Sequence, residues 1–183
     1  VEFERFGVDA DLQLDVDYTT GTIIVIVHEA SRTMLSDRGA NLTLDVSGIS
    51  FATGEAPAVL HLTGYSFFHR DHIDDLVRLM NQVTSSGGQV VLDASSAGFL
   101  ADHGAQWWWE IASQATILRA NEDEARFLTG TDDMGQAVEA FTHHGLTGIV
   151  TLAEQGAMVC SAGSAPVHRP AHPLGEGGLV DPT

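Results

Sequence analysis

The pattern of hydrophobic and polar residues predicts a short region of β structure near the start of the chain. Residues 12–16 alternate apolar with polar side chains, which is the period of a half-buried strand. Residues 22–27 form a β-branched run, and a turn near 28–31 leads to a second short stretch at 32–35. Together these segments predict a small antiparallel sheet.

Beyond residue 39, predicted strands alternate with predicted helices. The strands are 59–63, 89–93, 115–118, 148–152 and 157–160, the helices are 71–83, 101–113, 121–128 and 134–144, and the Gly/Pro-rich stretch 170–178 is a loop. This alternation indicates a parallel sheet covered by helices. Ligands of such sheets bind beyond the carboxyl ends of the strands, so the residues that follow each strand are the candidates for function.

Composition excludes several classes of partner and site. The 183 residues carry a formal charge of −17, and all 8 basic residues are Arg. Nucleic acids and anionic membranes bind basic surfaces, so neither is expected as a partner. Without Lys the chain can form neither a Walker phosphate loop nor a protein-kinase site. No dedicated transition-metal site is predicted from the 9 His residues, which include no His-Glu-x-x-His motif.

The single cysteine, Cys160, excludes an internal disulfide and a cysteine-rich zinc site. The chain has no apolar run near the ~20 residues needed to cross a bilayer, and its start does not resemble a signal peptide. These features predict a cytoplasmic protein.

Polar residues follow each predicted strand. Asn121 and Glu124 stand at positions i and i+3 of a helix start, where both can face one point. Spacing alone favours a helix cap with its capping-box partner, although the same pair could contact phosphate and metal. Thr151 ends a strand and Gly156 follows it; by spacing alone they are a β-branched strand residue and a hairpin glycine.

Two further strand ends carry residues suited to a small polar ligand. Tyr65 follows the strand 59–63, and its ring could stack on a sugar or be an ordinary half-buried side chain. Asp93 ends the next strand and could bind a sugar hydroxyl, or equally fix its own loop by a hydrogen bond.

Several short motifs also succeed one another in an order typical of one enzyme family. They are Thr20-Gly21 before the β-branched run, Gly39-Ala40-Asn41, Asn121-x-x-Glu124 followed by Leu128-Thr129-Gly130, Val150-Thr151-Leu152 with Gly156-Ala157, and Val180-Asp181-Pro182-Thr183. In this order they resemble the ribokinase-like, or PfkB-type, carbohydrate kinases. The resemblance covers nearly the whole chain.

The resemblance implies an α/β fold of the ribokinase-like type, a three-layer sandwich with a mostly parallel central sheet and a small antiparallel β lid. Residues 1–40 would form the lid region with its connection, and residues 41–183 a partial core that is incomplete at both ends. The implied function is an ATP-dependent sugar kinase, which transfers the γ-phosphoryl group of ATP to a sugar hydroxyl.

The resemblance also implies roles for individual residues. Asn121, Thr151 and Gly156 would bind the nucleotide, and Glu124 would hold Mg²⁺ through water. Asp181 resembles the position that helps to bind a monovalent cation, K⁺, in many members. By their places in this fold, Tyr65 and Asp93 would contact the sugar.

The chain departs from the family pattern at several positions. The Gly-Ala-Gly-Asp motif that carries the catalytic base is expected beyond Thr183, and the early Gly-Gly segment before Val1. Ala153 replaces a usual Gly, while Ser95 and Gly98 stand where many members have Asn and Arg. The chain by itself is therefore expected to be inactive.

The alternative hypothesis is a non-catalytic module derived from such a kinase. It would bind a sugar or a nucleoside, or form a homodimer through the lid strands, whose exposed edges are natural pairing surfaces.

Overall fold

The computed structural model describes residues 2–28, 31–49, 51, 59–67 and 72–173. The chain divides into two compact units, Val1–Gly48 and Ile49–Thr183. None of the helices in the described ranges is long and apolar enough to cross a membrane.

The first unit is built around a two-stranded antiparallel sheet. Its elements are α1 (Glu2–Arg5), β1 (Thr20–His28), β2 (Ser31–Gly39) and the 3-10 helix η1 (Ala40–Thr43). The register pairs Thr20 with Gly39 and His28 with Ser31. The β-branched run 22–27 lies within β1, because branched side chains suit the extended backbone. The predicted small antiparallel sheet is confirmed.

The predicted strand at 12–16 was wrong, because this segment has no partner strand in the described structure. Its apolar side chains face solvent; Leu14 is 87% and Val16 96% exposed. The polar residues hold the segment instead. The side chain of Gln13 bonds the backbone of Thr43 and Asp45 at 3.2 and 2.8 Å. Local side-chain bonds of this kind compete with strand pairing.

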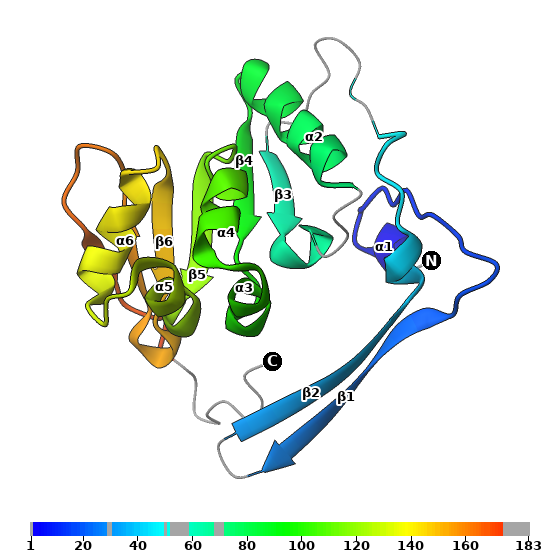
Figure 1. Ribbon diagram of the computed structural model, residues 1–183, viewed down its shortest axis with the longest axis horizontal. Coiled ribbons are helices and arrows are strands. Elements are labelled where there is room, and N and C mark those ends of the chain that lie inside the picture. The colour runs from blue at the N-terminus through cyan, green and yellow to red at the C-terminus, as the bar shows by residue number, and fades with distance from the viewer. Residues whose placement is uncertain (1, 29–30, 50, 52–58, 68–71, 174–183) are drawn as a thin grey trace. The chain divides into compact units, whose positions relative to one another are not determined.

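The second unit contains a mixed sheet in the order β3-β4-β5-β6-β7-β8 (Figure 1). The strands are β3 (Val59–Thr63), β4 (Gln89–Asp93), β5 (Ile117–Asn121), β6 (Thr147–Thr151), β7 (Ala157–Cys160) and β8 (Val167–Arg169). β3 to β6 are parallel neighbours, whereas β7 and β8 continue the sheet antiparallel. The sequence predicted the parallel part correctly, and β8 was missed.

The helices and short 3-10 turns connect these strands. They are η2 (Gly64–Phe67), α2 (Ile73–Ser85), α3 (Ala97–His103), α4 (Ala105–Ala112), α5 (Glu122–Thr129), α6 (Met134–Thr142) and η4 (Ala153–Gln155). Helices α2 to α6 lie on one face of the sheet (Figure 1). Each connection between parallel strands is right-handed and adds the next strand at the same edge, so all the connecting helices fall on the same face. The described residues supply two layers of the predicted sandwich.

The core lies between this helical layer and the sheet. Leu92, Leu118 and Gly148 are register neighbours on the covered face, and both leucines are fully buried. Gly148 admits α6 closely, because a Cβ at this position would lie 2.7 Å from the carbonyl oxygen of Val138. The opposite face of the same strands carries the polar strand-end residues, which places them outside this core.

The predicted single helix over 101–113 is divided into α3 and α4 at Gly104. This residue has φ +87°, which a helix cannot contain, and its N–H donates to Leu100 O at 2.8 Å. The three consecutive tryptophans, 107–109, lie in α4, after this division. Trp108 is completely buried, while Trp107 and Trp109 are half-buried.

Candidate functional site

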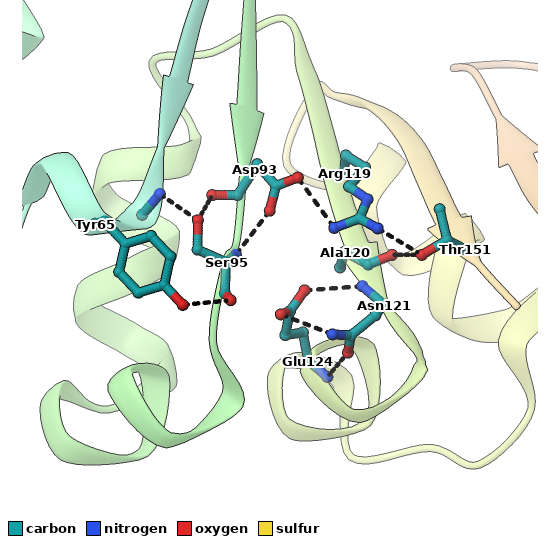
Figure 2. A network of polar contacts seen from close by, with 9 residues as sticks. Tyr65, Asp93, Ser95, Arg119, Ala120, Asn121, Glu124 and Thr151 are labelled. Carbon is teal, nitrogen blue, oxygen red and sulfur yellow. Dashed lines mark hydrogen bonds and ion pairs between the residues drawn. The ribbon is translucent and has the colours of Figure 1, made fainter. Parts of the chain in front are cut away.

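The carboxyl ends of the parallel strands bring polar side chains to one edge of the sheet (Figure 2). Parallel pairing sets Asp93 beside Arg119 and Asn121 beside Thr151. Side chains of a strand alternate between faces, so Arg119 and Asn121 share a face with these partners. The residues therefore form one group on the face of the sheet opposite α2 to α6.

Arg119 joins the ends of three neighbouring strands. Its Nη1 contacts Asp93 Oδ2 at 3.0 Å, and its Nη2 donates to Thr151 Oγ1 at 2.9 Å. The side chain of Arg119 is 36% exposed and that of Asp93 21%. Water therefore reaches both partners, and one guanidinium links an acid on β4 to a hydroxyl on β6.

Asn121 and Glu124 form a complete capping box at the start of α5. Asn121 Oδ1 accepts from Glu124 N at 2.9 Å, and Glu124 Oε2 accepts from Asn121 N at 2.8 Å. In addition, Asn121 Nδ2 donates to Glu124 Oε1 at 2.9 Å. The cap that spacing alone favoured is thus present, and it engages both carboxylate oxygens of Glu124.

Glu124 is a buried acid, with an exposed fraction of only 1%. Burial raises the pKa of Glu124, and Asp93 adds to this, whereas the hydrogen bond from Asn121 N and the charge of Arg119 oppose the rise. A buried carboxylate is tolerated here because Asn121 supplies a hydrogen bond to each oxygen.

The raised pKa of Glu124 predicts a particular pH dependence. The folded state holds the Glu124 proton to a higher pH than the unfolded chain, whose carboxyl titrates near 4.5. The native chain should therefore lose stability relative to Glu124→Gln as pH rises above this value, until the folded pKa is passed. Urea unfolding of both proteins from about pH 4 to 8 measures the difference. A difference in unfolding free energy between the two proteins that does not change with pH would contradict the raised pKa of Glu124.

Tyr65 and Ser95 make a second small network on the β3 side of the edge. Tyr65 Oη donates to Ser95 O at 3.2 Å, and Gly64 N donates to Ser95 Oγ at 2.8 Å. Asp93 Oδ1 in turn accepts from Ser95 N at 2.8 Å. Ser95 has φ +69°, a conformation uncommon for a residue with a side chain, and these bonds hold it there. The tyrosine is anchored by its hydroxyl, while the residue stays 52% exposed.

A family model for the pfkB family carbohydrate kinases matches residues 2–183. The chain belongs to this family. A search of curated protein sequences finds no match.

Solved structures of ribokinase-like enzymes share the fold of this pfkB family chain. Adenosine kinase from Sinorhizobium meliloti superposes with a TM-score of 0.81 at 20% identity, covering 96% of this chain and 54% of that protein. Fructokinase from Vibrio cholerae O395, with fructose, ADP and calcium bound, gives 0.77 at 22% identity, covering 95% and 58%. A candidate Ribokinase II from E. coli, in complex with ATP and Mg²⁺, gives 0.70 at 20%, covering 87% and 52%. The chain spans about half the length of these enzymes.

The family resemblance singled out two further residues, Gly156 and Asp181. Gly156 is in the turn before β7, and its φ of +100° and crowded surroundings show a structural need for glycine. A Cβ there would lie 2.5 Å from Ala171 N. Asp181 lies outside the described residues. A nucleotide contact at Gly156 and a cation contact at Asp181 both stay predictions.

The oxygen atoms at the edge of this pfkB family sheet suit a Mg²⁺ ion that keeps its water shell better than one that they would ligate directly. Glu124 is buried and both of its oxygens are occupied, so it could act on an ion only through water. In the described ranges no three His, Cys, Asp or Glu side chains gather as metal ligands would.

Arg119 is the residue of the site that the sequence reasoning missed. A signal was available, since Arg119 is the only Arg on the parallel strands β3 to β6 and stands two residues before Asn121. A charged residue inside a strand of a parallel sheet is unusual, because both faces of such strands are normally buried.

Proposed function

We propose that this pfkB family chain is part of an ATP-dependent carbohydrate kinase that transfers the γ-phosphoryl group of ATP to a sugar hydroxyl. The observation that carries the proposal is the gathering of Asp93, Arg119, Asn121 and Thr151 at the carboxyl ends of adjacent parallel strands. Ligands of open α/β sheets bind in this place.

Phosphoryl transfer depends mainly on positioning and on neutralising charge. Asn121 and Thr151 offer an amide and a hydroxyl to the polyphosphate from neighbouring strand ends, and Gly156 lies in the turn that follows β6. Mg²⁺ would neutralise the phosphate charge, and Glu124 would orient its water shell through the capping box. Asp181 would help to hold K⁺.

The acceptor sugar would lie toward β3. Tyr65 is 52% exposed and its hydroxyl donates to Ser95 O, and its aromatic ring would contact the sugar. The carboxylate of Asp93 would accept a hydrogen bond from a sugar hydroxyl.

The general base is expected outside the 183 residues, in a Gly-Ala-Gly-Asp motif after Thr183. Two acids of the described edge, Asp93 and Glu124, are engaged: Asp93 contacts Arg119 and Ser95, and Glu124 is buried against Asn121. We therefore expect the isolated chain to be inactive. We also propose a cytoplasmic location, because ATP and phosphorylated sugars are cytoplasmic metabolites.

Calorimetric titration with MgATP, with Thr151→Ala and Thr147→Ala as a matched pair, tests the nucleotide half of this proposal. Both threonines lie on β6, but Thr147 is at the other end and contacts Ser161. Thr151→Ala should weaken MgATP binding by about tenfold, the loss of one hydrogen bond to a charged group, and Thr147→Ala should not. Equal affinities would contradict the nucleotide site.

A coupled assay of ADP formation with a panel of sugars tests the catalytic half. The 183-residue chain should show no turnover, and a chain extended in frame through a Gly-Ala-Gly-Asp motif should phosphorylate at least one sugar. Turnover by the shorter chain would place the base within it.

The alternative, a non-catalytic binding or dimerisation module, is favoured by one observation. The two-stranded sheet exposes apolar side chains along its length, among them Ile23, Ile24, Val27 and Leu35, which are between 53% and 71% exposed. Such a surface suits a homodimer through β1 and β2. Analytical ultracentrifugation of the chain and of Ile24→Asp would detect it: the native chain should dimerise and the variant should not. A stop codon directly after Thr183 would also favour this alternative.

A further inference from the structure

We propose that Arg119 is a nucleotide-binding residue whose availability is controlled by Asp93. One arm of its guanidinium would leave the Asp93 carboxylate and bind the polyphosphate, while the other keeps its hydrogen bond to Thr151. The inference rests on the proposed nucleotide site and adds to it a residue and a competition that set its affinity.

The charge of the edge is the first reason. Glu122, Asp123 and Glu124 occupy the first turn of α5, and Asp93 lies on the neighbouring strand. A polyphosphate brought to this place meets acids, so a cation is needed to hold it. The chain contains no Lys, and Arg119 is the only Arg on the parallel strands that meet here.

The geometry of Arg119 is the second reason. Its Nη1 and Nη2 point to different partners, Asp93 at 3.0 Å and Thr151 at 2.9 Å, and 36% of the side chain is exposed (Figure 2). The planar guanidinium matches phosphate in a two-point contact, and phosphate can replace a carboxylate without loss of ideal geometry. A partly exposed ion pair contributes little stability, so the exchange costs little.

The nearby Arg126 is held very differently. It contacts Glu122 at 3.5 Å, Asp123 at 2.8 Å and Asp132 at 3.0 Å. Its three acidic partners lie on α5 or just beyond it, and none of them is a strand-end residue. Its exposed fraction of 41% is close to that of Arg119, which makes it a matched control.

The competition has a consequence for the acceptor. While Arg119 contacts Asp93, one oxygen of that carboxylate is engaged, and the other accepts from Ser95 N. Transfer of the guanidinium to a phosphate would release that oxygen for a sugar hydroxyl. Nucleotide binding by Arg119 would thus be linked to the readiness of the sugar site.

Calorimetry with MgATP and with inorganic tripolyphosphate tests the inference on the chain as it exists. The proteins are the native chain, Arg119→Gln, Arg126→Gln, Asp93→Asn and the double variant R119Q/D93N. We expect Arg119→Gln to weaken binding of both ligands by about tenfold or more and Arg126→Gln to change it less than about twofold. Asp93→Asn should tighten binding by about threefold to tenfold, because it frees the guanidinium.

The double variant separates competition from simple charge repulsion. If Asp93 acts by occupying Arg119, the gain from Asp93→Asn should vanish when Arg119 is already replaced by Gln. A gain of equal size in both backgrounds would overturn the competition, and native affinity in Arg119→Gln would overturn the binding role. Thermal unfolding of each variant shows whether it is folded. If Arg119→Gln is not folded, Arg119→Lys takes its place, with an expected partial loss of binding.

The result also distinguishes this inference from the proposed function. Native binding of MgATP that is sensitive to Thr151→Ala but not to Arg119→Gln would overturn the inference and leave the nucleotide site standing. Arg119-dependent binding of tripolyphosphate without binding of MgATP would support the anion contact and overturn the proposed nucleotide.

Discussion

Asn121→Asp is expected to weaken MgATP binding strongly and to lower the free energy of unfolding by about 3 kcal/mol. The substitution keeps the shape of the side chain and the oxygen that caps α5. It replaces the Nδ2 donor, which lies 2.9 Å from Glu124 Oε1, with a second carboxylate oxygen. Two carboxylates in contact at a buried position cannot both stay ionised without a large cost.

The same substitution places a negative charge where the proposed polyphosphate would lie. We expect MgATP affinity to fall by about 100-fold, and urea unfolding with calorimetry measures both effects. The stability deficit should shrink as pH falls, because one proton shared between the introduced carboxylate and that of Glu124 removes the repulsion.

Asn121→Ser is the matched control, since its hydroxyl can still accept from Glu124 N while adding no charge. It should cost about 1 kcal/mol of stability. Asn121→Asp with stability equal to Asn121→Ser would show that the added carboxylate has no repulsive effect on Glu124.

Gly156→Ala is expected to destabilise the second unit by more than about 3 kcal/mol. The residue has φ +100° and ψ −125°, a region open in practice only to glycine. An added Cβ would also lie 2.6 Å from the carbonyl carbon of Pro170, and backbone cannot move aside as a flexible side chain can. This turn connects β6 to β7, so the strain would fall on the backbone that follows Thr151, the last residue of β6.

Gly163→Ala is the control for this prediction, because Gly163 has φ +75° but open space around its Cβ position. It should lose only the conformational contribution of about 1–2 kcal/mol. Urea unfolding followed by tryptophan fluorescence compares the two variants. Equal losses would show that the approach of residues 169–171 to Gly156 contributes nothing.

The fold of the second unit could be predicted in large part from the sequence. The alternation of short apolar runs with amphipathic segments is a local signal, and it placed β3, β4, β6 and α6 within about two residues of their bounds. The errors were also local in origin. Gly104 ends one helix and precedes the next, which a hydrophobic pattern does not register, and residues 12–16 alternate without a partner strand in the described part of the chain.

The candidate site was predicted unevenly for a related reason. Asn121 and Glu124 could be paired from their spacing, because a capping box is made within one helical turn. Arg119 could not be paired, since its partners Asp93 and Thr151 lie 26 and 32 residues away in sequence. Only the register of neighbouring strands brings such residues together.

The sequence by itself determined the order of elements, the family motifs and the excess of acids, because each of these depends on residue identity and short-range spacing. The tertiary structure decided that Glu124 is buried, that Arg119 joins three strands and that the polar strand ends share one face. These features depend on parallel pairing, in which one register fixes the neighbours of every side chain at once, and no local pattern specifies that register.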